Sequence, residues 1–454
     1  MTKARLLVVV LVAVLMTVAG ASAQLPAKDP GVRGTTVGGA DPIPLPGLSP
    51  SEMAMFLAGL KDFRETENVA DGLGPRFNLD SCAGCHNQPA TGGSSTGSNP
   101  QAGMTNQYNV LPSFITPDGP VREVRYKRNP DGTPDGGVHA LFVISGRADA
   151  DDNCTIKQPN FERQYANGNV IFRIPTPVFG AGLIEQIPDA TILANQRANV
   201  SAKNALGIGG RANRIRLGLT GEPNNNGNDG TIARFGWKAQ NKSLLLFAGE
   251  AYNVEMGITN ELFPTERDET LGCQYANTPN DVTNTDPAVG PTMSAIERFA
   301  FFMRFLAPPQ PSPDQPGGTS SISKGGQLFG SVGCALCHTP TLYTGNASVA
   351  ALRKKPVNLY SDLLVHNMGP GLADDISQGA ASGDEFRTAP LWGLGQRVFF
   401  LHDGRTTDLI ATIRAHKSAG NTQYRDSEAN IVVDRFNALS DNDKRDLLNF
   451  LRSL

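Results

Sequence analysis

The pentapeptide Cys-x-x-Cys-His occurs twice in the chain, and it constrains the fold more than any other feature of the sequence. The copies are Cys82–His86 and Cys334–His338, in a chain with only six Cys and six His among 454 residues. In this pattern two thiols attach covalently to a haem and the adjoining His binds its iron. Zinc is the alternative occupant, but the Cys pairs of zinc sites lie only about 15–20 residues apart. The motifs therefore predict two c-type haems. Their attachment points would be Cys82, Cys85, Cys334 and Cys337, and their iron ligands His86 and His338.

Residues 1–23 have the pattern of a secretory signal peptide. Lys3 and Arg5 precede an apolar run over residues 6–18, and Ala21–Ala23 forms a good cleavage site. The run is too short to span a bilayer comfortably, and no later stretch reaches the roughly 20 apolar residues that a membrane helix needs. We therefore expect a periplasmic or secreted protein with no transmembrane segment after cleavage.

Two further cysteines, Cys154 and Cys273, make an even pair in an oxidising compartment, so we expect a disulfide between them. Closing a loop of about 120 residues would stabilise the fold by ~4–5 kcal/mol in the chain-entropy model. The alternative is two buried free thiols.

The composition along the chain predicts two units and a linker. Residues 307–318 contain five prolines and two glycines, which cannot continue a helix and predict a stiff linker. The linker separates an N-terminal haem unit, residues 49–306, from a C-terminal cytochrome c-like unit, residues 319–454. We interpret residues 24–48 as a flexible N-terminus.

Local patterns predict a mainly α-helical fold with coil-rich insertions and a few short strands. Ser49–Glu52 is a capping box with Pro at the first helical position, and it indicates a helix start. Apolar spacing predicts further helices over residues 296–306 and over Ser440–Leu454, the latter with its first residue as N-cap. Residues 119–229 are rich in Gly, Asn, Asp and Pro, so we expect a long insertion of loops and short strands such as Val170–Arg173.

An internal repeat relates the two units. Residues 172–182 are similar to residues 386–395 with one residue of slippage, and the segments 235–244 and 401–409 follow in the same order. This shared order after each haem motif indicates two cytochrome-like units, the first of which carries the long insertion.

The repeat also predicts what faces each haem iron from the far side. Leu409, Ile413 and His416 share one helix face, because positions i, i+4 and i+7 align. His416 is therefore the predicted second ligand of the second haem. The matching position of the first unit, seven residues after Leu244, is Ala251, whose methyl group cannot bind iron. We therefore expect an open first haem. The rival ligands are His366 and Met368 for the second haem, and Met104 and His139 for the first.

Peroxide chemistry at an open haem needs an acid–base group that takes a proton from one peroxide oxygen and delivers it to the other. Glu255 lies four residues after Ala251 and is the first candidate. Glu185 is the second candidate. For any single Glu, a solvated helix face is the ordinary alternative.

The chain resembles a family of di-haem oxidoreductases described as peroxidases and sometimes labelled thiol oxidoreductases. The residues that carry this resemblance are Gly180–Pro188, Phe235–Ala239, Pro390–Gly395, Leu401–Arg405 and His416. More distantly, the layout is similar to bacterial di-haem cytochrome c peroxidases and to the enzyme that matures methylamine dehydrogenase. The resemblance implies a peroxidatic N-terminal haem, an electron-transferring C-terminal haem, Trp237 between them and Glu255–Gly257 as the catalytic segment. It also makes Ca²⁺ between the units a candidate ion.

Several positions depart from the peroxidases that the chain resembles. Phe247 stands at the position that matches their active-site Gln, and no His follows Cys82–His86 where some of them have a switchable ligand. His416 falls where the peroxidases have Met and the maturation enzyme has Tyr. Because Met ligation raises the potential of a haem, a second haem with two His ligands should have a lower potential than its peroxidase counterpart.

The sequence thus predicts an exported di-haem oxidoreductase of the peroxidase type. The first haem would reduce peroxide or a similar oxidant, and the second would relay electrons from a small donor protein or a quinone-linked donor. The alternatives are an electron-transfer cytochrome that turns over no substrate and a haem-dependent oxygenase. Ala251 and Glu255 favour the enzyme, whereas Phe247 favours the carrier. The net charge of −3, which becomes more negative without Lys3 and Arg5, gives no basic surface for nucleic acid.

Overall fold

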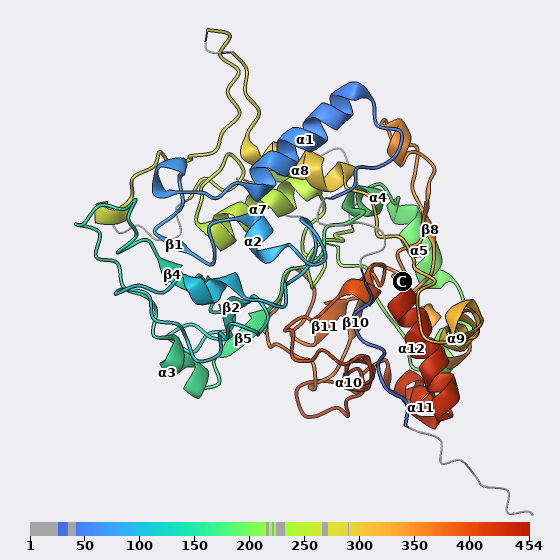
Figure 1. Ribbon diagram of the computed structural model, residues 1–454. Helices are drawn as coiled ribbons and strands as arrows, with labels where there is room; N and C mark the ends of the chain where they lie inside the picture. The colour runs from blue at the N-terminus through green and yellow to red at the C-terminus, as the bar shows by residue number, and fades with distance from the viewer. Residues whose placement is uncertain are drawn as a thin grey trace, which may run out of the picture.

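The computed structural model describes residues 26–34, 42–214, 218–219, 222–223, 232–265, 271–288 and 290–454. The expected signal peptide, residues 1–23, lies outside the described residues. Within them the fold is mainly helical, with small sheets and much coil, which confirms the predicted fold class (Figure 1). No helix in these ranges is both long and apolar enough to cross a membrane.

The elements of the described residues are as follows. The α-helices are α1 (Pro50–Arg64), α2 (Cys82–Cys85), α3 (Phe161–Ala166), α4 (Ala181–Glu185), α5 (Asp189–Arg197), α6 (Val200–Ala205), α7 (Leu244–Met256), α8 (Ala295–Phe305), α9 (Gly318–Val332), α10 (Leu409–Ala415), α11 (Asn430–Ala438) and α12 (Asp441–Ser453). The 3₁₀ turns are η1 (Val69–Asp71), η2 (Pro100–Gly103), η3 (Leu271–Cys273), η4 (Cys334–Leu336), η5 (Ala350–Leu352) and η6 (Leu394–Gln396). The strands are β1 (Arg76–Phe77), β2 (Glu123–Tyr126), β3 (Val138–His139), β4 (Phe142–Val143), β5 (Val170–Arg173), β6 (Gly218–Leu219), β7 (Glu222–Pro223), β8 (Leu342–Tyr343), β9 (Pro356–Val357), β10 (Val365–Asn367) and β11 (Glu385–Arg387).

The strands form one three-stranded sheet and several antiparallel pairs. The sheet has the order β3-β2-β5, and its register places Val124 opposite Phe172. The pairs are β1-β4, β6-β7, β8-β9 and β10-β11. Strands β5 and β11 carry the two copies of the internal repeat, so the repeat marks equivalent strands in the two units.

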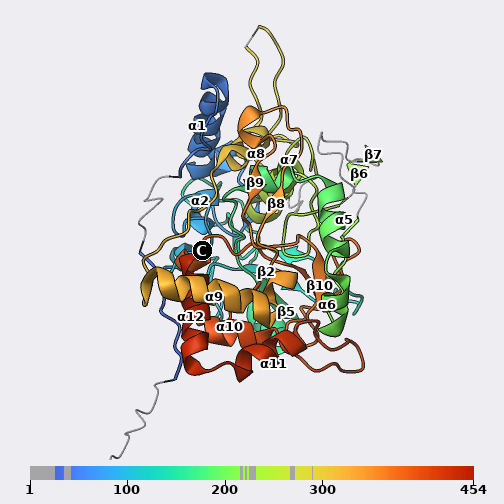
Figure 2. The ribbon, with the colours of Figure 1, turned by 90° about the vertical axis from the view of Figure 1, so that its right-hand side faces the viewer.

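A pair of packed helices brackets each Cys-x-x-Cys-His motif. In the N-terminal unit α1 packs on α8, and in the C-terminal unit α9 packs on α12 (Figures 1 and 2). The ring of Phe63 on α1 lies 4.8 Å from that of Phe302 on α8. Phe329 on α9 lies 5.3 Å from Phe450 on α12. Buried aromatic contacts of this kind hold the first and last helices of each unit together.

One glycine in each pair lets the two helices approach closely. A Cβ atom at Gly59 would lie 2.1 Å from the carbonyl oxygen of Arg298, and one at Gly325 would lie 2.0 Å from that of Asp446. No side chain fits at either crossing, so both positions need glycine. The two units are therefore similar in the way their helices pack as well as in sequence.

Several predicted boundaries are confirmed. Ser49 and Glu52 form the capping box at the start of α1, Ser440 caps α12, and β5 spans Val170–Arg173. The interpretation of residues 119–229 was incomplete, because this insertion also contains α3, α4, α5 and α6. These helices have nine residues or fewer, which is too short for apolar periodicity to indicate them.

Residues 26–34 lie against the C-terminal unit, although this segment belongs to the stretch that we interpreted as flexible. The Asp29 carboxylate accepts hydrogen bonds from Nε and Nη2 of Arg452, each at 2.8 Å, and from the backbone N–H of Leu409, also at 2.8 Å. The backbone N–H of Arg33 donates to the carbonyl of Gly395. The segment thus connects α12 with the start of α10.

Candidate functional site

The first haem motif opens into a cavity of about 370 Å³, which we call cavity 1. Cys82 and Cys85 lie on α2, and His86 is the residue at which that helix ends. Nδ1 of His86 lies 3.1 Å from the carbonyl oxygen of Gly93, which orients the N–H toward that oxygen and leaves Nε2 as the metal-binding atom. Burial lowers the pKa of His86 to about 4, so the ring is neutral, as a metal ligand must be.

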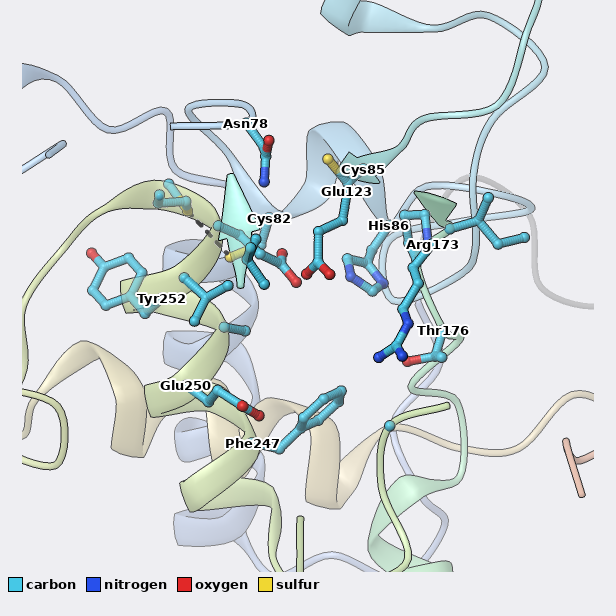
Figure 3. A pocket seen from close by; sticks show the side chains of 18 of the residues that line it. Asn78, Cys82, Cys85, His86, Glu123, Arg173, Thr176, Phe247, Glu250 and Tyr252 are labelled. Atoms are coloured by element: carbon cyan, nitrogen blue, oxygen red, sulfur yellow. Dashed lines mark hydrogen bonds between the residues drawn. The ribbon is translucent and has the colours of Figure 1, made fainter. Parts of the chain in front are cut away.

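Helix α7 forms a wall of cavity 1. It contributes Phe247, Glu250, Ala251 and Glu255 (Figure 3). Among the described residues that line this cavity, His86 is the only histidine. A methyl group therefore stands where the repeat places an imidazole in the other unit.

The rival ligands of the first haem lie outside the lining of cavity 1. The ring of His139 stacks on that of Tyr126 at 3.7 Å, and its Nε2 contacts the carbonyl of Gly136. Met104 packs against the hydrophobic core. The methionines that do line the cavity are Met256 and Met303.

Three carboxylates face cavity 1. Glu250 and Glu255 come from α7 and Glu123 comes from β2, and Figure 3 shows Glu123 and Glu250 directed into the cavity. Burial, followed by the negative charges of Glu123 and Glu250, raises the pKa of Glu255 to about 8. A carboxyl group with a pKa near neutrality can both accept and deliver a proton at physiological pH.

Glu185, the second candidate for the acid–base group, lies elsewhere. Its carboxylate forms an ion pair with Nε of Arg304 at 2.7 Å and accepts a hydrogen bond from the backbone of Leu244. Glu185 therefore joins α4, α7 and α8 and does not line cavity 1.

Trp237 stands between the two haem motifs. It lines cavity 1, a second cavity and a third, so its ring separates the two larger spaces. The second, cavity 2, has a volume of about 30 Å³ and shares lining residues with both of the others. Nε1 of Trp237 donates to the carbonyl of Ile174 at 2.9 Å, and its ring lies edge-on to His402 at 6.4 Å. These contacts fix the indole in one orientation.

The second haem motif opens into cavity 3, which has a volume of about 210 Å³ and a mostly apolar lining. Cys334, Cys337 and His338 line it together with His416. Nδ1 of His338 lies 3.0 Å from the carbonyl of Tyr360, and Nδ1 of His416 lies 2.8 Å from that of Thr412. Both rings therefore keep Nε2 available. Burial, followed by the nearby His416, lowers the pKa of His338 to about 4.

The rival ligands of the second haem also line cavity 3. His366 uses both ring nitrogens, because Nε2 lies 3.0 Å from Asp362 and Nδ1 lies 2.7 Å from Glu428. This leaves no lone pair for iron. Met368 is buried in a small apolar cluster with Leu372 and Phe386.

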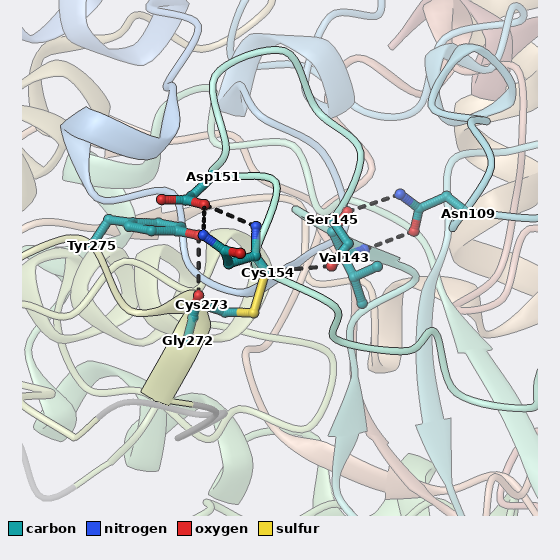
Figure 4. Close-up of a disulfide and its surroundings, with 9 residues drawn as sticks. Asn109, Val143, Ser145, Asp151, Cys154, Gly272, Cys273 and Tyr275 are labelled. Atoms are coloured by element: carbon teal, nitrogen blue, oxygen red, sulfur yellow. Dashed lines mark hydrogen bonds between the residues drawn. A yellow bond between two sulfur atoms is a disulfide. The ribbon is translucent and has the colours of Figure 1, made fainter.

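The structure joins Cys154 to Cys273 in a disulfide that spans 119 positions (Figure 4). The bond connects η3 to the loop after β4. Sγ of Cys154 lies 3.3 Å from the Ser145 hydroxyl, which ties the bridge to the neighbouring strand. The disulfide is thus confined to the N-terminal unit.

Sequence reasoning missed several residues of these cavities. Glu250 lies on the same helix as Glu255, whereas Glu123 reaches the same cavity from β2. His402 stacks on Phe386 at 4.4 Å, although its segment was noted only for the repeat and for the family resemblance. Arg387 and Arg397 line cavities 2 and 3. The only sequence feature that could have indicated these residues is that each is a polar residue with no role in forming its own helix or strand.

The residues present fit two haems. Each of the larger cavities combines two thiols with a neutral imidazole whose Nε2 is available, and the lining of cavity 3 is mostly apolar. Buried guanidinium atoms match the carboxylates of a haem, since Nε of Arg122, Arg125 and Arg173 in cavity 1 has no hydrogen-bond partner among the described residues. The described residues contain no group of three or more His, Cys, Asp or Glu that could hold a metal ion such as Ca²⁺.

The fold and these cavities define a di-haem protein. A family model described as "Di-haem oxidoreductase, putative peroxidase" matches residues 124–454, which is more than half of the chain. The chain therefore belongs to the family of di-haem oxidoreductases. The matched range excludes Cys82–His86. Comparison with curated proteins finds no match.

Two solved structures are similar to parts or all of the chain. Hydrazine synthase of Kuenenia stuttgartiensis, in crystals pressurised with xenon, shares 14% identity over 100% of both chains, with a TM-score of 0.35. A MauG-like protein associated with microbial copper homeostasis shares 17% identity over 62% of this chain and 90% of its own, with a TM-score of 0.29. Similarity at these scores supports no conclusion about the chain.

Proposed function

We propose that the protein is an exported di-haem peroxidase in which the two cavities have different tasks. Cys82 and Cys85 would hold one haem and Cys334 and Cys337 the other through thioether bonds. The difference in ligands carries the proposal: cavity 3 offers a second imidazole, His416, whereas the matching residue in cavity 1 is Ala251. An iron with a free position can take a small oxidant, and an iron with two His ligands can only transfer electrons.

A haem in cavity 1 would supply the iron for binding and reducing peroxide. Glu255 would take the proton from the oxygen that binds and deliver it to the leaving oxygen, so that water departs. The reaction consumes one molecule of hydrogen peroxide, two electrons and two protons, and it forms two molecules of water. Because burial raises the pKa of Glu255 to about 8, the carboxylate form that takes the proton from peroxide becomes more populated as the pH rises toward 8.

Trp237 would link the two redox centres. It belongs to the lining of both large cavities, and its hydrogen bond to Ile174 keeps the ring in place. Electrons from a small donor protein or a quinone-linked donor would enter at the second haem. The export signal, residues 1–23, supports a periplasmic or secreted location.

The first test is electron paramagnetic resonance of the fully haem-loaded protein, as purified and after reduction by one electron. We expect a high-spin ferric signal in at least one state, beside a low-spin signal from two His ligands. Peroxide consumption would then be measured with a chemical electron donor. Two low-spin haems in both states, with no peroxide turnover, would identify an electron-transfer cytochrome and end the proposal.

A further inference from the structure

Two buried arginines of the C-terminal unit have no carboxylate partner in the part of the chain that the structure describes. Arg387, at the end of β11, is 9% exposed, and Arg397, directly after η6, is 8% exposed. Nε of Arg387 donates to the carbonyl of Gly236 at 2.9 Å. Burial lowers the pKa of both groups to about 10, and the charge of Arg397 contributes to the effect on Arg387. Two cations thus lie near each other in an apolar setting.

Three other buried arginines in the described residues pair with carboxylates of the chain. Arg173 forms an ion pair with Asp374 at 2.7 Å, and Arg452 forms one with Asp29 at 2.8 Å. Arg234 is fully buried and pairs with Asp189. A buried charge without a partner is costly, so two buried arginines without a carboxylate indicate that an anion from outside the chain binds here.

The location of the two arginines indicates which anion this is. Both line cavity 3 and also the small cavity 2, whereas Cys334 and Cys337 line cavity 3 alone. The guanidinium groups therefore lie on the side of cavity 3 that faces Trp237, away from the thiols. A haem has its vinyl groups on one edge and its two propionates on the opposite edge.

We propose that Arg387 and Arg397 bind the two propionates of the second haem and turn that edge toward Trp237. The inference rests on the proposed function, because it needs a haem in cavity 3. Guanidinium groups bind carboxylates in a fork geometry, and buried pairs of this kind are strong. The cysteines would then hold one edge of the haem through thioether bonds, and the arginines would hold the opposite edge through ion pairs.

The arginines would also change the potential of the second haem. Reduction of a haem iron adds one negative charge, which nearby cations stabilise. Arg387 and Arg397 would therefore raise the potential, opposite to the effect of replacing Met by His416. The arginines would thus keep the potential of a haem with two His ligands high enough for its electron donor to reduce it.

The test compares Arg397→Gln, Arg387→Gln and Arg397→Lys in the haem-loaded protein. Spectroelectrochemical titration follows the two haems separately. We expect each Gln variant to have a second haem of lower potential and an unchanged first haem, and we expect Lys to keep part of the effect because it keeps the charge. Arg405→Gln is the control, because Arg405 pairs with Asp403 and lines none of the three cavities.

A second measurement applies even if the Gln variants fold poorly. Resonance Raman spectra of the second haem report the propionate bending modes, which should shift in Arg397→Lys, where the fork is lost. Haem content separates the two proposals. Two haems per chain with unchanged potentials and unchanged propionate modes would overturn the arginine assignment and leave the proposed function intact. Fewer than two haems per chain in the unaltered protein would overturn both proposals.

Discussion

The two units use the same framework for different purposes. Each has a first and last helix that pack at a glycine, and each places a Cys-x-x-Cys-His motif between them. They differ in what faces the motif: cavity 1 has three carboxylates and the methyl group of Ala251, whereas cavity 3 has one carboxylate, Glu428, and the imidazole of His416. The comparison shows that the helices determine where a haem can sit, and that a few residues on the facing helix determine what it can do.

Removing His416 would make the C-terminal unit resemble the N-terminal one, and this is the largest effect that we expect. His416→Ala deletes the second imidazole, so the second haem should change from low-spin to high-spin. Electron paramagnetic resonance measures the change. Met368→Leu is the matched control, because it keeps the volume at another residue of cavity 3 and should leave the haem low-spin. A low-spin second haem in His416→Ala would show that another residue is the ligand.

Glu255→Gln tests the distinct chemistry of cavity 1. The amide cannot exchange a proton with peroxide, so turnover should fall by ~10²–10⁴-fold, the usual contribution of general acid–base catalysis. Stopped-flow mixing with peroxide measures the rate, while the spectra of both haems should stay unchanged. An unaltered rate in this variant would exclude Glu255 as the proton carrier.

The two units are also held together by different means. The N-terminal unit has the disulfide Cys154–Cys273, and the double variant Cys154→Ser, Cys273→Ser should lose ~4–5 kcal/mol of unfolding free energy in the chain-entropy model. Urea unfolding followed by circular dichroism measures the loss. If the disulfide acts only within its own unit, the potential of the second haem should be unchanged, and a shift there would show that the units are coupled.

Glu250→Gln should have the smallest effect, on the pH profile alone. The negative charge of Glu250 is one cause, after burial and Glu123, of the raised pKa of Glu255. Its removal lowers that pKa, so Glu255 loses its proton at a lower pH than in the unaltered protein. Because the unprotonated carboxylate takes the first proton from peroxide, peroxide turnover should then begin at a lower pH than in the unaltered protein. A profile that does not move would show that the two carboxylates are independent.

Local signals in the sequence were sufficient for the framework. The capping box at Ser49, the N-cap at Ser440 and the strand Val170–Arg173 all depend on neighbouring residues, and all were correctly placed. The helical register also places His416 and Ala251 at equivalent positions, on helices that face the two motifs. Such features need no knowledge of distant contacts.

The remaining site residues depend on distant contacts. Glu123 on β2 and Glu255 on α7 line the same cavity, and no spacing in the sequence relates the two. Arg387 and Arg397 could not be distinguished from solvated arginines until their burial was known. The short helices α3 to α6 lie where apolar periodicity is weak, and α4 packs against α7 and α8, which are outside the insertion.

The contact between Asp29 and Arg452 joins segments that are 423 positions apart in the sequence. The same carboxylate accepts the backbone N–H of Leu409, at the start of the helix that ends beside His416. A segment that precedes the N-terminal unit in the sequence therefore helps to position a helix of the C-terminal unit. The surroundings of His416 are complete only when Asp29 has paired with Arg452.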